Sequence, residues 1–389
     1  MPAYDLARRK PGNRGETQRL QNLIRAVTFA AVCGVCTAAF AASPPYAPSP
    51  VVTSVNWDFS SLRSAAPGSD LWPVTWADDG NLYTSWGDGG GFGGTNSLGR
   101  VSIGFARITG TPSSLSATNV FGGVSALTSA TFVGKAGGML SVNGVLYMTL
   151  ELQDQWLKLK LARSTDHGQT WQFNSLTSWD FDEPDGAFSD MSFLNFGKDY
   201  QGARDSYVYA YSQDKRATHD NVWRTNTIAM ARVPKDQVMN RSAYEYFAGL
   251  DASGNPIWTT AINARKPVFS DPNGVGWAVR VDYDPGIKRY LLTTWHSWDG
   301  SWGIFDAPEP WGPWTTVAYY AQWIDNQPKF GFSFPQKWLS PDGRSFVMVF
   351  SGTGPYDGWN TVSGTFVVSA VPAASAPPIP TDVRLTTSP

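Results

Sequence analysis

Two aspartates have the residue type and the spacing that acid and base catalysis needs. Asp70 precedes an apolar strand, and Asp88 follows the next strand in a glycine-rich loop that lets a substrate approach closely. Because a hairpin returns the chain to the end at which it began, both carboxyl groups should open on one face. Polysaccharide hydrolysis uses such a pair, one group protonating the leaving oxygen and the other activating water or attacking the anomeric carbon. We therefore expect both to be catalytic, with a loop cap as the alternative for Asp88.

Three further acidic residues and one histidine are expected near the same face. Asp190 opens the inner strand of a later copy of this unit and is a candidate third acid, or else a solvated loop residue. Glu151 and Asp154 follow the second strand of another copy, in the place equivalent to Asp88, so we expect them to contact the substrate. His296 follows the corresponding strand of a further copy, although a lone histidine is more often a hydrogen-bonded scaffold residue.

Tryptophan offers a flat apolar surface on which neutral sugars stack through their C–H groups. The candidates for this substrate-binding role are Trp72, Trp86, Trp277 and Trp298. The chain has 18 tryptophans, however, so most of them must pack between sheets.

Other polar motifs have a structural explanation. The stretch Ser164-Thr-Asp-His-Gly-Gln-Thr-Trp171 matches the Asp-box of sialidase-type propellers, in which the aspartate accepts backbone N–H groups and the glycine takes a positive φ. Asp166 and His167 are therefore not expected to be catalytic. Asp78 and Asp79 lie in the turn at the opposite end from the catalytic pair and are expected to be turn formers.

No metal or cofactor site is expected from the sequence. There is no His/Glu cluster with the spacing of a zinc site and no EF-hand loop. The run Gly87 to Gly94 lacks the Lys-Ser/Thr ending of a phosphate loop, and the esterase pattern Gly-x-Ser-x-Gly is missing. We expect no cofactor. A single structural Ca²⁺ in a central funnel of the fold, however, would leave no pattern in the sequence.

The charge balance disfavours nucleic acid and membranes as partners. Lys and Arg number 30 against 32 Asp and Glu, a formal net charge of −2, so no strong field would attract a polyanion. With 14% aromatic and 16% charged residues, the composition is that of a globular protein. A neutral polysaccharide substrate fits better, and we expect a monomer.

The first 42 residues have the organisation of an export signal. A basic segment precedes an apolar run that ends in Ala39-Phe-Ala41, which predicts a signal peptide over residues 1–42 and a secreted or periplasmic protein. The alternative is a single membrane anchor. Both cysteines, Cys33 and Cys36, lie in this segment, so the mature chain has no thiol. Residues 43–50 are expected to be a Pro/Ser linker, and residues 373–389 a disordered tail.

A weakly repeated unit organises residues 51–372, the expected catalytic domain. In each copy an apolar strand enters a polar turn and a second apolar strand leaves it. The five turn markers, at intervals of 57 to 80 residues, are Gly80, Gly144, Ser206, Gly286 and Gly343. Sheets repeated around an axis cover each other's faces, which a lone meander cannot do. We predict an all-β, five-bladed β-propeller with four-stranded antiparallel blades and an Asp-box hairpin, with a two-sheet sandwich as the alternative.

Two local expectations complete this fold. The strand Val51–Val55 should pair with Thr365–Ser369 and close the ring, which removes a free sheet edge. The segment Lys235–Phe247, which follows Pro234, is the best candidate for a helix.

Several stretches carry a family resemblance, in order, between about Val51 and Ser369. Among them are Asp70-Leu-Trp-Pro-Val-Thr-Trp, Trp86-Gly-Asp-Gly, Gly202-Ala-Arg-Asp-Ser-Tyr-Val-Tyr, Tyr244-Glu-Tyr-Phe-Ala-Gly-Leu-Asp and Gly303-Ile-Phe-Asp-Ala-Pro-Glu-Pro-Trp. They resemble the endo-D-arabinanase family, glycoside hydrolase family 183, formerly a domain of unknown function. The resemblance implies a five-bladed propeller that cleaves internal α-D-arabinofuranosyl linkages. It also implies two catalytic aspartates, which correspond here to Asp70 and Asp88.

Other functions stay open at this point. The segments Glu151–Trp156 and Asp185–Ser192 depart from the family's commoner pattern, which leaves the sugar open. A propeller that binds carbohydrate without catalysis is one alternative, because aromatic funnels bind sugars equally well. A polysaccharide lyase is another, and it would need an anionic uronate, a neutralising cation and a Tyr or His base.

Overall fold

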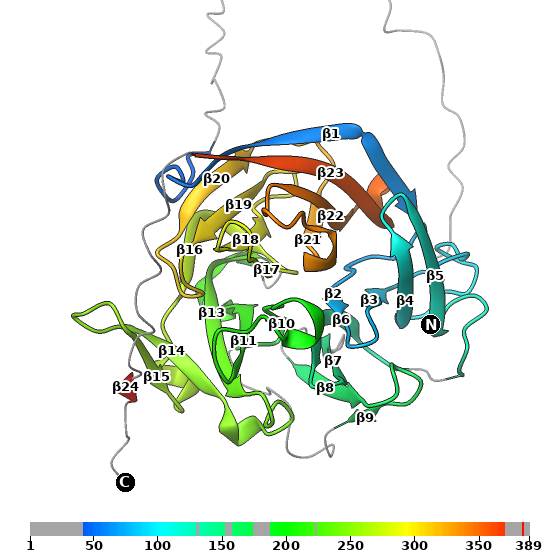
Figure 1. Ribbon diagram of the computed structural model, residues 1–389, viewed down its shortest axis with the longest axis horizontal. Coiled ribbons are helices and arrows are strands. Elements are labelled where there is room, and N and C mark those ends of the chain that lie inside the picture. Colours follow the sequence, from blue (N-terminus) through cyan, green and yellow to red (C-terminus); the bar gives the residue numbers. More distant parts are fainter. Residues whose placement is uncertain are drawn as a thin grey trace, which may run out of the picture. The chain divides into compact units, whose positions relative to one another are not determined.

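Five sheets, antiparallel except for one short parallel pair at the outer edge of the third, stand around one axis and form the five-bladed β-propeller that the repeats predict (Figure 1). The computed structural model describes residues 42–129, 132–151, 158–173, 187–221, 224–369 and 383–384. In each blade the first strand lies innermost and later strands follow outward, with the N-terminal strand outermost in the last blade. Large apolar side chains fill the space between neighbouring blades, so most strand positions are buried.

Blades 1, 2 and 4 each have four strands. Blade 1 consists of β2 (Val74–Trp76), β3 (Leu82–Gly87), β4 (Ile103–Thr111) and β5 (Ser114–Phe121). Blade 2 consists of β6 (Lys135–Val142), β7 (Val145–Glu151), β8 (Leu159–Ser164) and β9 (Gln172–Phe173). Blade 4 consists of β17 (Arg280–Asp284), β18 (Arg289–Trp295), β19 (Trp302–Ala307) and β20 (Thr315–Tyr320).

Blade 3 is enlarged, and blade 5 combines both ends of the domain. Blade 3 consists of β10 (Ser192–Phe193), β11 (Tyr207–Gln213), β13 (Arg224–Pro234) and β14 (Glu245–Leu250), extended by β12 (Thr218–Asn221), β15 (Pro256–Thr259), β16 (Phe269–Gly276) and β24 (Val383–Arg384). Blade 5 consists of β21 (Lys329–Ser333), β22 (Ser345–Gly352), β23 (Trp359–Val368) and β1 (Val52–Ala65). The described helices are all three-residue 3₁₀ turns: η1 (Lys198–Tyr200), η2 (Lys215–Ala217), η3 (Arg241–Ala243), η4 (Ile262–Ala264), η5 (Gln336–Trp338) and η6 (Gly354–Tyr356).

The five predicted turn markers all lie between the first and the second strand of a blade, which confirms the repeat. Gly80, Gly144 and Gly343 have φ of 83°, 73° and 71° there, a conformation that glycine adopts without steric cost. We call this end of the propeller the foot face. The opposite end, which carries the loops between second and third strands, is the funnel face.

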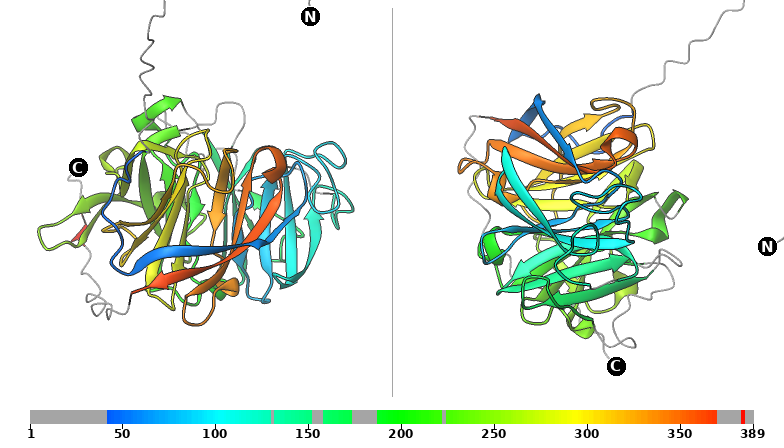
Figure 2. Two further views of the ribbon diagram at one scale, coloured as in Figure 1. Left: turned by 90° about the horizontal axis from the view of Figure 1, so that it is seen from above. Right: turned by 90° about the vertical axis from the view of Figure 1, so that its right-hand side faces the viewer.

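The N-terminal strand closes the ring, as predicted. β1 pairs antiparallel with β23 from Val52 opposite Val368 to Ala65 opposite Trp359, and Figure 2 shows the two strands side by side. A bulge between Asp58 and Arg63 interrupts the register. Because β1 ends at the funnel face, it leads the chain directly to the first strand of blade 1.

The expectation of a linker over residues 43–50 is wrong. Ser49 N–H donates to the Thr316 carbonyl, and Thr316 N–H donates to the Ala47 carbonyl, both at 2.8 Å. The ring of Tyr46 packs against Phe269, with 5.2 Å between ring centroids. One aromatic anchor thus fixes a segment whose Pro/Ser composition is typical of linkers.

The expectation of a helix over Lys235–Phe247 is also wrong. The segment contains only η3 and the start of β14. Tyr244, Tyr246 and Phe247 are buried in the core between blades, so tertiary packing overrides the local pattern.

The turn over Ser164–Trp171 has a structural role. The Asp166 carboxylate accepts hydrogen bonds from the Thr170 N–H and hydroxyl, and Gly168 has a φ of 86°. The Trp171 ring packs edge-on against Phe105 of blade 1, with 5.1 Å between centroids. The hairpin therefore joins blade 2 to blade 1.

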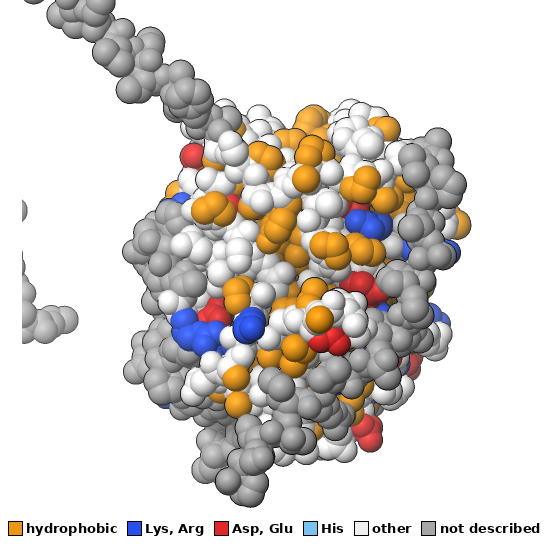
Figure 3. All heavy atoms as spheres, turned by 90° about the vertical axis from the view of Figure 1, so that its left-hand side faces the viewer, with side chains coloured by type: hydrophobic (Ala, Val, Ile, Leu, Met, Phe, Trp, Pro, Cys, Tyr) orange, Lys and Arg blue, Asp and Glu red, His pale blue; other side chains and the backbone are white. Residues whose placement is uncertain are grey.

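The outer wall on the side of β16 and β20 shows apolar side chains scattered among polar ones, with charged groups few (Figure 3). Among the described residues, no helix has the length and apolar character to span a bilayer. The described residues do not include Asp154. They include only residue 42 of the predicted signal peptide and only residues 383–384 of the predicted tail.

Replacing Asp166 by Ala should lower the free energy of unfolding by about 1–2 kcal/mol, because it removes hydrogen bonds worth about 1 kcal/mol each from a partly exposed turn. Chemical denaturation measures this change. An unchanged stability would contradict the role given to this turn.

Candidate functional site

Asp70 and Asp88 lie at the funnel face of blade 1. Asp70 N–H donates to the Gly87 carbonyl at 2.8 Å, and Gly87 N–H donates to the Asp70 carbonyl at 3.0 Å. This reciprocal pair extends the β2–β3 ladder by one bridge. Since Asp88 directly follows Gly87, the hairpin brings both predicted catalytic residues to the same end.

Gly87 is required by the crowding around it. A Cβ atom at this position would lie 2.7 Å from Asp70 Oδ1 and 3.2 Å from Lys135 Cδ. The Asp70 carboxyl group and the lysine stem therefore both cover the glycine. Any larger residue there would displace the carboxyl group.

Two cations hold the Asp88 carboxylate. Lys135 Nζ forms a hydrogen-bonded ion pair with Asp88 Oδ1, and Arg100 Nη2 lies 3.2 Å from the same oxygen. The Asp88 side chain is 34% exposed, and within the described part of the chain its Oδ2 accepts no hydrogen bond. Asp88 is thus a carboxylate with one tethered oxygen and one open oxygen.

Asp70 has the opposite electrostatic environment. Although the residue is only half-buried, its Oδ1 is buried and has no hydrogen-bond partner among the described residues. Burial raises the pKa of Asp70 to about 7; Lys135 opposes this shift, while the charges of Asp88 and Asp357 add to it. A carboxyl group with this pKa carries a proton about half of the time at neutral pH, so Asp70 is suited to donate one.

Asp357 adds a third carboxyl group from blade 5. Its carbonyl accepts the Gly68 N–H at 2.7 Å, which ties the β22–β23 loop to the segment that leads to Asp70. Burial raises the pKa of Asp357, and the charge of Asp88 raises it further. Asp357 is not among the predicted site residues, although it follows the second strand of its blade, in the place equivalent to Asp88.

The backbone beside both aspartates is strained. Leu71, Trp72 and Asp88 have φ of 74°, 43° and 55°. Each such residue costs about 1–3 kcal/mol and persists only where its surroundings hold it. The Leu71 carbonyl packs against Gly331, where a Cβ atom would lie 2.6 Å away, and lies 3.5 Å from Arg280 Nη2. Blades 4 and 5 therefore hold the turn that follows the first aspartate.

Glu151 and Asp190 belong to a second, buried charge cluster that joins blades 2, 3 and 4. Lys215 Nζ donates to Glu151 Oε1 at 3.1 Å, and Ala278 N–H donates to Asp190 Oδ2 at 2.8 Å. Burial raises the pKa of both carboxyl groups, and Lys215 opposes the shift in each. Both carboxyl groups thus have polar partners of their own, and Lys135, the partner of Asp88, lies opposite Glu151 in the β6–β7 ladder, so this cluster adjoins the Asp70 group.

The four candidate tryptophans have two different environments. Trp72 and Trp86 are 0% exposed and pack against each other with 5.4 Å between ring centroids. They have no open face for a sugar, so their predicted stacking role is wrong. Trp298 is 46% exposed, and its ring lies 5.2 Å from that of the partly buried Trp277. This second pair forms an aromatic platform at the rim of blade 4.

His296 is a scaffold residue. Its Nδ1 lies 3.2 Å from the Gly274 carbonyl, and its ring stacks on Tyr319 with 4.3 Å between centroids. Burial lowers the pKa of His296 to about 4, so the side chain is neutral at pH 7. A buried imidazole cannot touch a substrate in the funnel, and the predicted substrate contact is wrong.

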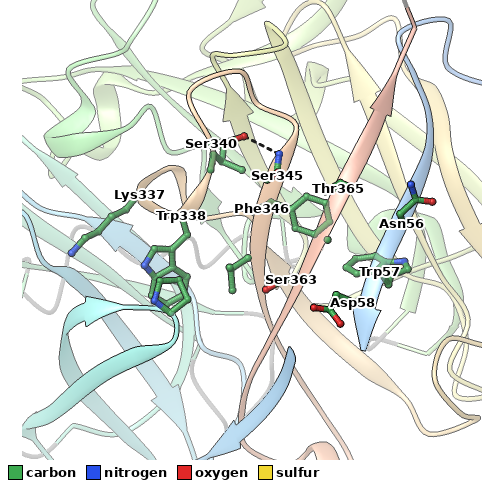
Figure 4. Close-up of a pocket in the computed structure, with 14 residues that line it drawn as sticks. Asn56, Trp57, Asp58, Lys337, Trp338, Ser340, Ser345, Phe346, Ser363 and Thr365 are labelled. Carbon is green, nitrogen blue, oxygen red and sulfur yellow. Dashed lines mark hydrogen bonds between the residues drawn. The ribbon is translucent and has the colours of Figure 1, made fainter. Parts of the chain in front are cut away.

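A groove of about 620 Å³ lies toward the foot face (Figure 4). Among its lining residues are Asn56, Asp58, Lys337, Trp338, Ser345 and Ser363. Lys337 Nζ donates to the Gly80 carbonyl at 2.7 Å, which fixes one wall beside the foot-face turn of blade 1. None of the predicted site residues lines this groove.

One group of side chains in the described residues could hold a metal ion. The ligand atoms of Asp78, Asp79 and His167 lie within 4.8 Å of one another. Both aspartates are exposed, and the group lies in foot-face turns, away from Asp70 and Asp88. It has no direct part in the chemistry of the funnel.

The sequence model of one protein family matches residues 127–359, which is more than half of the 389 residues. That family is described as a domain of unknown function, DUF4185. The chain belongs to this family. The DUF4185 match begins after blade 1 and so does not include Asp70 and Asp88. A comparison with curated protein sequences finds no match.

Several solved structures resemble this DUF4185 protein at low identity. A GH43_1 enzyme from Xanthomonas citri, complexed with xylotriose, is 12% identical over 86% of this chain and 94% of its own, with a TM-score of 0.46. RS223 β-xylosidase is 12% identical over 80% and 98%, with a TM-score of 0.47. Zg3597, a family 117 glycoside hydrolase from Zobellia galactanivorans, is 9% identical over 80% and 90%, with a TM-score of 0.42. At these scores the likeness supports no argument about the site of the DUF4185 protein.

Replacing Trp72 by Ala should lower the free energy of unfolding by about 3–5 kcal/mol, because the ring is fully buried. Replacing Trp298 should cost only about 1 kcal/mol, the contribution of a surface aromatic pair. Urea denaturation of the two variants measures the difference. Equal losses would contradict the core position of Trp72 and the surface position of Trp298.

Proposed function

We propose that this protein is a secreted glycoside hydrolase that cleaves internal α-D-arabinofuranosyl linkages of an arabinan-type polysaccharide. The observation that carries the proposal is the pair Asp70 and Asp88, which lie at one end of a hairpin in opposite electrostatic environments. The choice of α-D-arabinofuranose rests on the family resemblance of the opening blade. Internal cleavage fits a site built from loops on the open face of a propeller.

In this proposal Asp70 is the general acid and Asp88 is the general base. The protonated Asp70 donates its proton to the glycosidic oxygen as the bond from that oxygen to the anomeric carbon breaks. The open Oδ2 of Asp88 accepts a proton from a water molecule, whose oxygen attacks the anomeric carbon from the opposite side. Lys135 and Arg100 both pair with Oδ1 of Asp88, which leaves Oδ2 to contact the water. The products are two shorter chains, one of which has a new reducing end.

A neutral sugar suits the rest of the funnel face. The exposed ring of Trp298 offers an apolar surface for sugar C–H groups. The two cations beside Asp88 are both paired with its carboxylate, which favours a neutral ligand over an anionic uronate. His296, a candidate base for a lyase, is buried and neutral. These observations favour hydrolysis over elimination.

Asp70→Asn and Asp88→Asn should each lower kcat on a soluble α-D-arabinofuranan by at least about 100-fold, because each removes one proton-transfer group. Release of reducing ends measures the rate, and the melting temperature checks the fold. Asp342→Asn, at an exposed foot-face turn, is the matched control. Wild-type-like activity in both site variants would falsify the assignment. If the wild-type protein binds the polymer but does not cleave it, the result would instead favour a carbohydrate-binding propeller.

Lys135→Met removes a charge that lowers the pKa of Asp70 and pairs with Asp88. The acid must be protonated to act, so a higher pKa of Asp70 moves the alkaline limb of the pH–rate profile to higher pH. Lys337→Met at the foot face is the control. A profile that does not move would contradict the roles assigned to the aspartates.

A further inference from the structure

Exposed apolar side chains gather at the funnel face. The large hydrophobic residues with the highest exposure among the described residues are Phe59, Leu98, Leu127, Val133, Leu250, Trp298, Ile324 and Val367. Five of these eight, Leu98, Leu127, Val133, Trp298 and Ile324, lie in loops at the funnel face. Scattered surface apolar residues need no explanation, but their concentration on one face indicates a binding surface.

Ile324 occupies a conformation that its side chain disfavours. Asp325 N–H donates to the Trp323 carbonyl at 2.8 Å, and Ile324 between them has a φ of 65°. This is a γ-turn of the rare, strained kind, in which glycine or asparagine would cost less than a β-branched residue. The side chain is nevertheless 41% exposed, so burial in the core explains only part of its presence. A contact made at the surface would explain the rest.

Phe59 lies next to this turn on the bulge of β1. Its ring packs against Trp323, with 5.8 Å between centroids, and lies parallel to Trp57 at 6.5 Å. The bulge lets the strand turn this side chain outward, so it is 47% exposed. Phe59 packs on the buried Trp323, and Ile324 follows Trp323 in the chain, so we call the surface formed by the two exposed residues the distal platform.

The distal platform is continuous with the aromatic platform of blade 4. A Cβ atom at Gly300, two residues after Trp298, would lie 2.9 Å from the Gln327 carbonyl and 3.2 Å from that of Asp325. The β18–β19 loop thus touches the loop that contains Ile324.

The continuity extends to the carboxyl groups. Trp277 packs on Phe330 with 5.3 Å between ring centroids. The next residue, Gly331, contacts the carbonyl of Leu71, which directly follows Asp70. A line of contacts therefore leads from the carboxyl groups outward over blades 5 and 4.

We propose that the distal platform binds further units of the same polysaccharide chain whose cleaved bond lies at Asp70 and Asp88. The proposal rests on the proposed function. Residues that flank the platform in sequence, such as Gln322, Asn326 and Ser60, carry the amide and hydroxyl groups that bind sugar hydroxyls. Apolar faces beside such groups suit a neutral sugar chain. The occupant is therefore the polymer, held at a distance from the bond that breaks.

The test measures binding separately from cleavage. The parent protein is the Asp88→Asn variant, and the test protein carries Phe59→Ser and Ile324→Ser in addition. Affinity electrophoresis compares how strongly a gel that contains a soluble α-D-arabinofuranan retains each protein. We expect the double change to weaken the apparent affinity at least fivefold. With active enzyme, the ratio of kcat/KM on the polymer to kcat/KM on a short oligosaccharide of the same sugar should fall by a similar factor. Val367→Ser, a similarly exposed residue at the foot face, is the matched control and should change neither value.

Each outcome decides the proposal. Equal retention of the two proteins, or no retention of the parent, overturns it, provided that the melting temperature shows both to be folded. A dimer that the double change dissociates would make this surface an interface between copies and also overturn it. A third outcome separates the two proposals: the parent binds the polymer, the protein with the double change does not, and the wild type cleaves nothing. In that case the distal platform binds the polymer as proposed, and the hydrolase proposal is wrong.

Discussion

The pairing of β1 with β23 is the constraint on which the arrangement of the site depends. It turns a row of sheets into a ring, and its last register pair, Ala65 with Trp359, brings the N-terminal strand to the funnel face. The chain then reaches Asp70 within a few residues, past the Gly68 contact with the carbonyl of Asp357. The first aspartate is therefore positioned by the last blade as well as by its own.

The chemical difference between the two aspartates follows from this geometry. Asp70 lies inward against Gly87, where burial raises its pKa, while Asp88 lies outward, where Lys135 and Arg100 pair with its carboxylate. Left-handed backbone at Leu71 and Asp88 is the local cost of this placement. Neighbouring blades offset that cost, since the carbonyl of Leu71 is held against Gly331.

The sequence predicted the features that depend on local pattern. Turn residues such as Gly80 and Gly343 marked the blades, and a hairpin must return Asp88 to the end at which Asp70 lies. Features that depend on contacts between blades were not predictable in this way. Trp72 and Trp298 are the same residue type beside similar strands, and only the packed structure makes one a core residue and the other a surface one. Nothing local marks Lys135, on the next blade, as the partner of Asp88, whereas Asp357 follows the second strand of its blade and the same rule could have found it.

The pairing of β1 with β23 also determines when the propeller ring can close during synthesis. The Thr53 hydroxyl donates to the Val367 carbonyl across 314 residues of chain, so β1 can pair in blade 5 only after β23 has been synthesised. Until then its 14 residues have no partner in blade 5 and present a sheet edge to other chains. Contacts so distant in sequence form slowly. A chain truncated before Asp357 would therefore lose the contact that helps to position Asp70 and would also leave the edge of β1 exposed to other chains.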